Sequence, residues 1–471
     1  MPLILGTNSI KDTGYDVDNS LRFDDGGSEY LQRTPSSTGN RKTWTFSTWI
    51  KRSGIGLSAP MNVFGGEDGA SRYTDIMIGT PSGADDTFWF KQDTGTVAEL
   101  RSTLKLRDPS AWYHLVFVYD STNGTADDRM KMYVNGVQLT SFVTRTNVGS
   151  NVDSYVNTSG DNNYVGVYDG SSKWLDGYLC ETTLIDGTAL TPTSFGEFDS
   201  DSPTIWKPKD VSGLTFGTNG FYLEFKQSGT SQNSSGLGAD TSGNNQHFAV
   251  SNLTAVDQSI DTCTNNACTL NPLYRYTNNM TYSEGNLKVV GGGNSWQGAN
   301  STFYINKGKW FFEVKFASAT DVGNFYIGWT TAGDYNISEP YDNGIHYYNS
   351  DGGEIYANSS ALTTADYGTF ANGNIMGMAL DYDNSLLTVY KNGSAFVTDY
   401  DFSSATTTAK SGNLVTPTVA HYGSGTVEWN FSSPSFAISS GNTDANGYGN
   451  FEYSVPSGYY SLNTKNLAEF G

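Results

Sequence analysis

Two regions of this sequence combine aromatic rings with Asp, Asn and Gly, residue types that proteins use to hold sugars. They cover residues 164–174 and 335–348. Aromatic rings stack on sugar faces, while carboxylate and amide groups hydrogen-bond the hydroxyls. The alternative is packing between sheets, because strand side chains alternate and at least half of the rings should point inward. The ligand-binding candidates are Tyr168, Asp169, Trp174, Tyr335, Tyr341, Asn343, His346 and Tyr347.

No catalytic constellation is visible. Glycosidases built on β-sandwiches place two carboxylates on one strand face, in the style Glu-x-Asp-x-Glu, and no such run occurs. Asp381 and Asp383 fall at a hairpin turn, where Asp side chains bind backbone amides. His114, one of only four His, is expected in a strand core. No Gly-x-Ser-x-Gly elbow precedes a helix. We therefore expect no catalytic residues and no enzyme.

Calcium is the one cofactor that the sequence suggests. Ca²⁺ takes carboxylate, amide and backbone oxygens as ligands. Acidic turns occur at residues 85–86 and 127–128, at Asp161 and at Asp169, but none has the spaced form Asp-x-Asp-x-Asp-Gly. Solvated acidic turns are the alternative, so the metal ligands stay unknown.

The three cysteines are Cys180, Cys263 and Cys268. Their odd number argues against a disulfide framework, and no partners stand at zinc spacing. A local bridge between Cys263 and Cys268 and two ordinary thiols are the two alternatives for the last pair.

Composition excludes several classes of protein. The 471 residues include 27 Lys and Arg against 48 Asp and Glu, a formal net charge of −21 that repels phosphate backbones and argues against nucleic acid. With 14% aromatic and 16% charged residues, the chain is expected to fold rather than to be disordered. No apolar run approaches the roughly 20 residues of a membrane span. The first residues lack the pattern of a signal peptide.

The apolar residues alternate in short runs between Gly, Asn, Asp and Ser, which is typical of strands and turns. Residues 112–120 and 130–139 predict a strand followed by a hairpin that turns at Asn135 and Gly136. Residues 375–393 repeat this order of elements, which is a strand, an acidic turn, a second strand and an Asn-Gly turn. Two sandwiches of related architecture are therefore predicted.

The predicted fold class is all-β, with two antiparallel β-sandwich (jelly-roll) domains joined by an irregular connecting region. We expect an N-terminal anchoring segment at 1–18 and a first sandwich at 19–204. The connecting region covers 205–280, with a Gly/Ser/Asn stretch from Ser228 to Asn245. It is expected to drape over a domain rather than fold alone. The second sandwich and a C-terminal extension cover 281–471.

The first half resembles the laminin-G-like (concanavalin-A-like) jelly-roll family. The matching segments are 20–23, 30–31, 44–51, 112–114, 133–136 and 166–179. The second half resembles a SPRY domain through residues 308–314, 326–329, 373–381 and 387–393. Both resemblances imply bent β-sandwiches that serve chiefly as binding modules.

The tandem of these two modules is similar to virion proteins of tailed bacteriophages. This resemblance implies a virion surface structural protein that assembles in the host cytoplasm, with no signal peptide. It implies attachment to other virion proteins, and we expect the apolar residues Leu3, Ile4 and Leu5 to insert into another chain or into a homo-oligomer.

Two roles follow from this resemblance. The first is a tail-fibre or spike adhesin that binds host surface carbohydrate or protein. The alternative is a capsid decoration or head-fibre protein whose role is mainly assembly.

Overall fold

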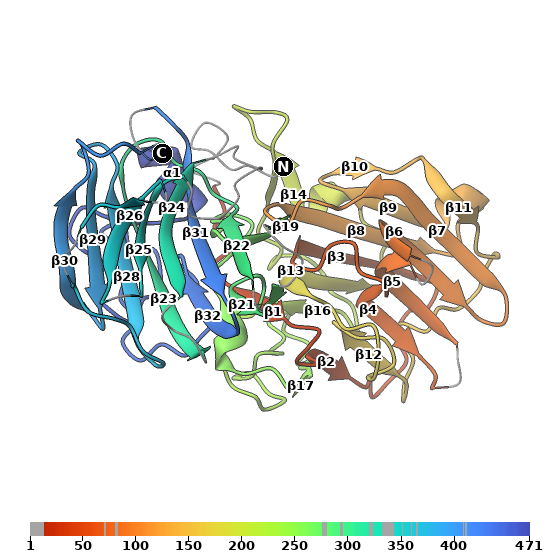
Figure 1. The fold of residues 1–471 in the computed structure, drawn as a ribbon. Coiled ribbons are helices and arrows are strands. Elements are labelled where there is room, and N and C mark those ends of the chain that lie inside the picture. The colour runs from red at the N-terminus through yellow and green to blue at the C-terminus, as the bar shows by residue number, and fades with distance from the viewer. Residues whose placement is uncertain are drawn as a thin grey trace. The chain divides into compact units, whose positions relative to one another are not determined.

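The computed structural model describes residues 14–69, 72–80, 83–275, 280–292, 295–319, 324–331, 343–350, 352–358, 360–363, 366–407, 409 and 412–471. The anchoring candidates Leu3, Ile4 and Leu5 lie outside these residues. The described chain divides into two compact units, one ending at Thr264 and the other beginning at Asn265. Figure 1 colours the strands of the first unit from red to yellow-green and those of the second from green to blue.

The N-terminal unit consists of two antiparallel sheets. In spatial order, the first contains β10 (Val137–Gln138), β9 (Met130–Val134), β8 (Trp112–Asp120), β3 (Thr43–Arg52), β13 (Gly177–Asp186), β1 (Ser20–Phe23) and β18 (Gln258–Ser259), with β16 (Phe221–Leu223) on β13. The second contains β11 (Phe142–Thr146), β7 (Val97–Lys105), β6 (Gly83–Asp93), β5 (Tyr73–Thr80), β4 (Met61–Glu67), β12 (Asn162–Val165), β2 (Tyr30–Arg33) and β17 (Ala249–Ser251). A separate ribbon pairs β14 (Gly196–Phe198) with β15 (Trp206–Pro208).

The two sheets enclose one hydrophobic core. Phe46 of β3 stacks on Phe64 of β4 with ring centroids 4.4 Å apart, so the rings join the inner faces of both sheets. The expected hairpin is confirmed, since Asn135 and Gly136 both adopt positive φ between β9 and β10. The fold class predicted from alternation is confirmed as well, with a β-sandwich in this unit.

The composition predicts an irregular connecting region at 205–280 that drapes over a domain, and residues 205–264 lie on the first sandwich and add short strands to its sheets. β16 pairs with β13, β17 with β2 and β18 with β1. The Gly/Ser/Asn stretch is ordered by Asp240, whose carboxylate accepts bonds from the amides of Tyr222 (2.9 Å), Ser242 (2.9 Å) and Gln246 (2.8 Å). Strands this short carry too weak an alternation to be recognised in the sequence.

The C-terminal unit is a second sandwich. In spatial order, one sheet contains β19 (Leu270–Arg275), β22 (Trp296–Ser301), β31 (Val415–Tyr422), β24 (Phe325–Thr331), β25 (Ile345–Tyr348), β26 (Glu354–Ala357) and β27 (Ser360–Ala361). The other contains β20 (Thr281–Ser283), β21 (Lys288–Gly291), β32 (Gly425–Asn430), β23 (Lys309–Ala319), β28 (Ile375–Asp381), β29 (Leu386–Lys391) and β30 (Ser394–Asp401), with β33 (Tyr460–Ser461) on β23.

The inner faces of this second sandwich meet at aromatic rings. Phe312 of β23 lies 5.5 Å from Trp329 of β24, centroid to centroid. The turn at Asn392 and Gly393 has positive φ at both residues, which confirms the second predicted hairpin.

The C-terminal helix α1 (Thr464–Phe470) is capped by the Asn463 side chain. Within the described residues, no helix has the length and apolar character needed to span a bilayer.

Candidate functional site

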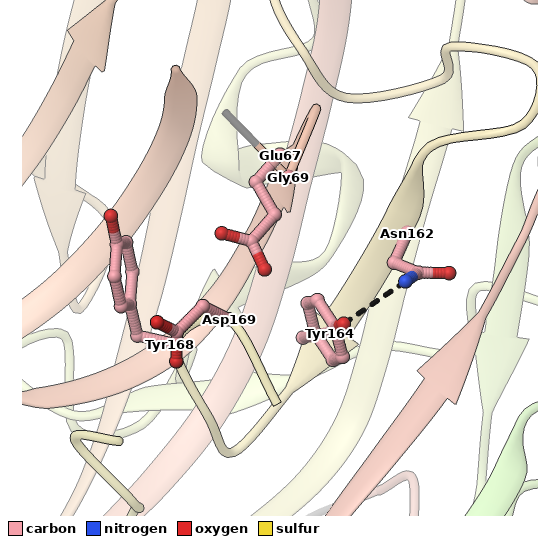
Figure 2. Close-up of a pocket in the computed structure, with 6 residues that line it drawn as sticks. All are labelled: Glu67, Gly69, Asn162, Tyr164, Tyr168 and Asp169. Carbon is pink, nitrogen blue, oxygen red and sulfur yellow. Dashed lines mark hydrogen bonds between the residues drawn. The ribbon is translucent and has the colours of Figure 1, made fainter. Parts of the chain in front are cut away.

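A pocket of about 330 Å³ lies on the N-terminal unit and includes two of the predicted ligand-binding residues (Figure 2). Glu67 ends β4 and Gly69 follows it, while β12 and the loop after it supply the other residues. The residues that line the pocket are Glu67, Gly69, Asn162, Tyr164, Tyr168 and Asp169. In Figure 2 the Glu67 carboxylate points into the space between the rings of Tyr168 and Tyr164.

The outer face of the second sheet forms the floor of this pocket. Phe64 and Val165 are opposite one another in the β4–β12 pair and point into the core. Since side chains alternate along strands, Tyr164, Asn162 and Glu67 point to the other face. Gly65, opposite Tyr164, makes room for the Asp75 carboxylate, with which a Cβ at this position would collide.

The loop after β12 is held in one conformation by its own polar groups. Tyr168 and Ser172 form an isolated antiparallel bridge. Asp169 and Gly170 between them have φ of 54° and 72°, the left-handed region that Asp tolerates and Gly favours. One Asp169 carboxylate oxygen accepts bonds from the Ser171 amide (3.2 Å), the Ser171 hydroxyl (2.7 Å) and the Ser172 hydroxyl (3.1 Å). The exposed Asp169 is therefore preorganised beside the pocket.

Neighbouring side chains orient the two tyrosine rings. The Lys173 ammonium lies 3.4 Å from the centroid of the Tyr168 ring, and Tyr73 meets that ring edge-on at 5.5 Å. The Asn162 amide donates to the Tyr164 hydroxyl over 3.0 Å. Both rings are thus fixed before any ligand arrives, which lowers the entropic cost of binding.

The pocket is acidic, and burial shifts the protonation of its carboxyls. Burial raises the pKa of Glu67 to about 7, and the nearby Asp169 charge adds to this rise while Lys173 opposes it. Burial also raises the pKa of Asp75, which stands opposite Gly65 on the neighbouring strand β5, well above its ordinary value. Burial lowers the pKa of Lys173, and the charges of Asp75 and Asp169 counter that effect.

The remaining candidates of the first loop and those of the second loop do not line this pocket. Trp174 is half-buried, and its indole N–H is buried without a hydrogen-bond partner. Asn343 is half-buried, and its backbone carbonyl accepts a bond of 2.6 Å from Thr330. Tyr335 and Tyr341 lie outside the described residues.

His346 and Tyr347 are core residues and are not placed to contact a ligand. Both have an exposed fraction of 0%. Burial lowers the pKa of His346 to about 3, which keeps the ring neutral. The Tyr347 hydroxyl donates to the Gly368 carbonyl. Both residues are buried because they lie in β25, an inner strand that pairs with β24 on one side and with β26 on the other.

Sequence reasoning missed Glu67, Gly69 and Asn162 as site residues, and it did not single out Tyr164, although this residue begins the candidate region 164–174. Glu67 reaches the pocket only because β4 pairs with β12, where it stands opposite Asn162. Local sequence carries no signal for this pairing. The loop that follows β12 could be recognised in the sequence as a candidate binding loop, because its aromatic and acidic residues are contiguous.

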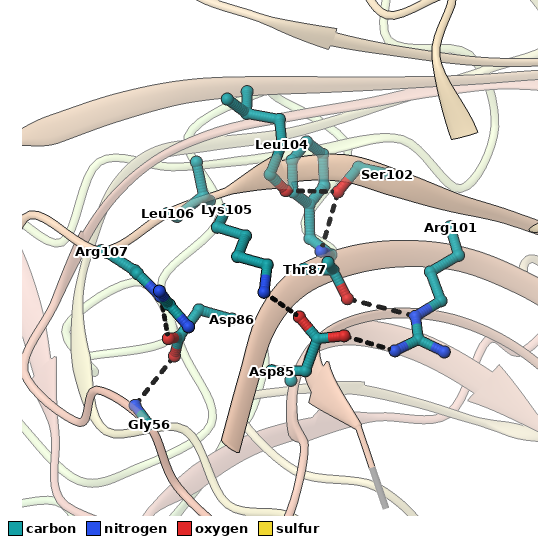
Figure 3. A network of polar contacts seen from close by, with 12 residues as sticks. Gly56, Asp85, Asp86, Thr87, Arg101, Ser102, Leu104, Lys105, Leu106 and Arg107 are labelled. Atoms are coloured by element: carbon teal, nitrogen blue, oxygen red, sulfur yellow. Dashed lines mark hydrogen bonds and ion pairs between the residues drawn. The ribbon is translucent and has the colours of Figure 1, made fainter. Parts of the chain in front are cut away.

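Asp85 and Asp86, a calcium candidate that the sequence places in a turn, lie instead in strand β6 and are neutralised by cationic side chains (Figure 3). The ion pairs join Arg101 (2.6 Å) and Lys105 (3.2 Å) to Asp85, and Arg52 (3.0 Å) and Arg107 (2.8 Å) to Asp86. At the turn 127–128, Asp127 pairs with Arg145 and Asp128 with Lys131. Among the residues that the structure describes, no group of three or more His, Cys, Asp and Glu side chains is arranged to hold a metal ion.

Both units are antiparallel β-sandwiches, and the N-terminal one carries a pocket lined by side chains. Residues 25–194 match the family model of the concanavalin A-like lectin/glucanases superfamily, in its laminin-G form, and residues 309–434 match the SPRY domain. The chain therefore contains a laminin-G-like domain followed by a SPRY domain. Lectin-like folds of this kind point to binding of glycans or proteins.

Several solved structures are similar to parts of the chain. The SPRY domain of human HERC1 is 14% identical, over 34% of this chain and 96% of that one (TM-score 0.28). The heptameric SAP-like pentraxin of Limulus polyphemus is 18% identical, over 38% and 80% (TM-score 0.29). Domain 4 of the arabinanase AbnA from Geobacillus stearothermophilus, in complex with arabinotriose, is 20% identical, over 34% and 68% (TM-score 0.26). No curated protein matches the sequence.

Proposed function

We propose that this protein binds glycans through the pocket between Glu67, Tyr164, Tyr168 and Asp169. The observation that carries this proposal is a single pocket that combines the half-buried Tyr168 ring with the Glu67 and Asp169 carboxylates, while the largely buried Tyr164 ring (7% exposed) forms part of its wall. Rings offer an apolar surface to the C–H faces of a sugar, and carboxylates accept bonds from its hydroxyls. The volume of about 330 Å³ falls in the lower range of small-ligand sites, which suits one or two sugar units.

The charge of the pocket selects among sugars. Glu67 and Asp169 line it, and Lys173 is the cation that faces Tyr168. The Asp169 carboxylate, joined by Glu67 once that group has lost its proton above about pH 7, would repel an anionic sugar, whereas neutral and amine-bearing sugars would not be repelled. A glycan array probed with the intact protein tests this. We expect signals on neutral or amino sugars, and an array without any signal would refute glycan binding.

Binding should strengthen as pH rises through about 7. Above that pH Glu67 loses its proton, and a charged carboxylate accepts hydroxyl bonds more strongly than a neutral acid. We expect an association constant roughly fivefold higher at pH 8 than at pH 6 for a neutral sugar, measured by calorimetry. Glu67→Gln should flatten this dependence. Glu197→Gln, at an exposed glutamate of β14, is the matched control and should retain it.

We propose a virion surface as the setting for this binding, with the protein acting as a tail-fibre or spike adhesin. The support is the resemblance of the tandem arrangement to phage virion proteins. In this proposal Leu3, Ile4 and Leu5 attach the chain to other virion proteins. Antibody labelling of particles in electron microscopy tests the location. Labelling on tails would support the adhesin, whereas labelling on capsid faces or vertices would support the decoration protein and overturn the tail location.

A further inference from the structure

Two cysteines that are far apart in the sequence meet in the N-terminal unit. The Sγ atoms of Cys180 and Cys263 lie 3.7 Å apart, although the residues are separated by 83 positions. Both are free thiols in the structure. A disulfide needs an S–S separation of about 2.05 Å, so the sulfurs are in contact and unbonded. The third thiol, Cys268, belongs to the core of the other unit, so of the two alternatives for Cys263 and Cys268 the structure shows separate thiols rather than a local bridge.

The surroundings allow the two sulfurs to react unequally. Cys180 lies on β13 and is fully buried, whereas Cys263 is half-buried in the irregular segment after β18. Cys263 is the more exposed of the two residues, so we place the first attack there. β13 also has a register shift directly after Cys180, and Glu181 there has a φ of 52°. A bulged strand and an irregular segment can adjust more easily than two regular strands.

We propose that Cys180 and Cys263 form a thiol–disulfide exchange site that a small-molecule disulfide oxidises to an intramolecular bond. The Cys263 thiolate attacks one sulfur of the small disulfide, whose S–S bond breaks. The attacked sulfur stays on Cys263 as a mixed disulfide, and the other sulfur leaves as the first thiol. The Cys180 thiolate then attacks the Cys263 sulfur and releases the second thiol. Two protein thiols are oxidised, the small disulfide is reduced to two thiols, and the protons of the cysteines pass to the leaving groups.

A disulfide between Cys180 and Cys263 would link the last residues of the first unit to strand β13. Cys263 follows Asp261, which is already paired with Lys51 of β3, and precedes Thr264, whose hydroxyl accepts a bond of 2.9 Å from the Val17 amide. A cross-link here closes a long loop and restricts the unfolded chain. Burial and the neighbouring Cys180 raise the pKa of the Cys263 thiol well above its usual range. Closure should therefore be slow at neutral pH and faster in alkaline solution.

Incubation of the full-length protein with oxidised glutathione at pH 8.5, followed by thiol counting in denaturant and peptide mapping, tests this site. We expect the three thiols of the reduced protein to fall to one, with a cross-linked peptide that contains Cys180 and Cys263. The melting temperature of the first unit should rise by roughly 5–10 °C. Cys268→Ser should show the same rise, and Cys263→Ser none.

Three outcomes would overturn the proposal. They are retention of all three thiols, glutathione held on Cys263 while Cys180 stays reduced, and a bond between Cys263 and Cys268. The mapping uses the unmodified protein, so it decides the question even if Cys263→Ser fails to fold.

Discussion

Replacing Asp261 by alanine will destabilise the N-terminal unit by about 3–5 kcal/mol. Its carboxylate lies 2.7 Å from the Lys51 ammonium, and the two side chains are each 1% exposed. The second carboxylate oxygen accepts a bond of 3.1 Å from the Trp112 indole. The substitution leaves the Lys51 charge buried without its carboxylate, and this unpaired charge is the main source of the expected loss.

Urea unfolding followed by tryptophan fluorescence measures this loss of stability. Trp112, which donates to Asp261, and Trp49 are buried in one hydrophobic cluster of the N-terminal unit. Asp128→Ala is the matched control. Asp128 pairs with Lys131 over 3.0 Å, but its side chain is 42% exposed, so we expect a change below about 1 kcal/mol. A loss at Asp261 no larger than that of the control would show that residues 258–264 are not an integral part of the first sandwich.

In the C-terminal unit, Asp444→Ala should cost about 3 kcal/mol or more. The side chain is buried, and its carboxylate connects the loop at 444–448 with β33 and α1. The donors are the amides of Asn446 (2.9 Å), Tyr448 (3.1 Å) and Ser461 (3.0 Å), the Ser461 hydroxyl (2.6 Å) and the Asn466 side chain (2.7 Å). Alanine would leave several of these buried donors unsatisfied, and each carries a desolvation penalty.

Calorimetric melting of the full chain tests this prediction. We expect a lower transition temperature for the C-terminal unit and an unchanged one for the N-terminal unit. Asp383→Ala is the control, because this exposed carboxylate accepts a bond of 3.1 Å from the amide of the half-buried Gly308, at the surface of the unit. Equal effects at both sites would contradict the role of Asp444 as the connection between the C-terminal segment and the sandwich.

Local patterns predicted the strands and hairpins because their causes are local. Alternating apolar residues mark long strands such as 112–120, and Asn-Gly marks turns with positive φ at both residues. The edge strands in 205–264 could not be predicted, since three-residue strands are defined by the neighbours they pair with.

The site was predictable to the extent that it is contiguous. Tyr168 and Asp169 lie in one loop whose composition indicates binding, and both line the pocket. Glu67 joins them through the pairing of β4 with β12, and no local pattern records that pairing. His346 shows the converse limit. An aromatic, polar run in a sequence does not distinguish a binding loop from a buried strand, and β25 is the latter.

The central claim is that the pocket beside Tyr168 holds a glycan, and calorimetric titration of pocket variants with a glycan selected on the array tests it most directly. We expect Tyr168→Ala to weaken binding roughly tenfold through loss of the ring. Asp169→Asn, which keeps an acceptor for the loop hydroxyls, should weaken it several-fold. Asp201→Asn, at an exposed loop position, is the control and should bind like the unmodified protein. Unchanged affinity in both pocket variants, with all proteins folded, would contradict the account.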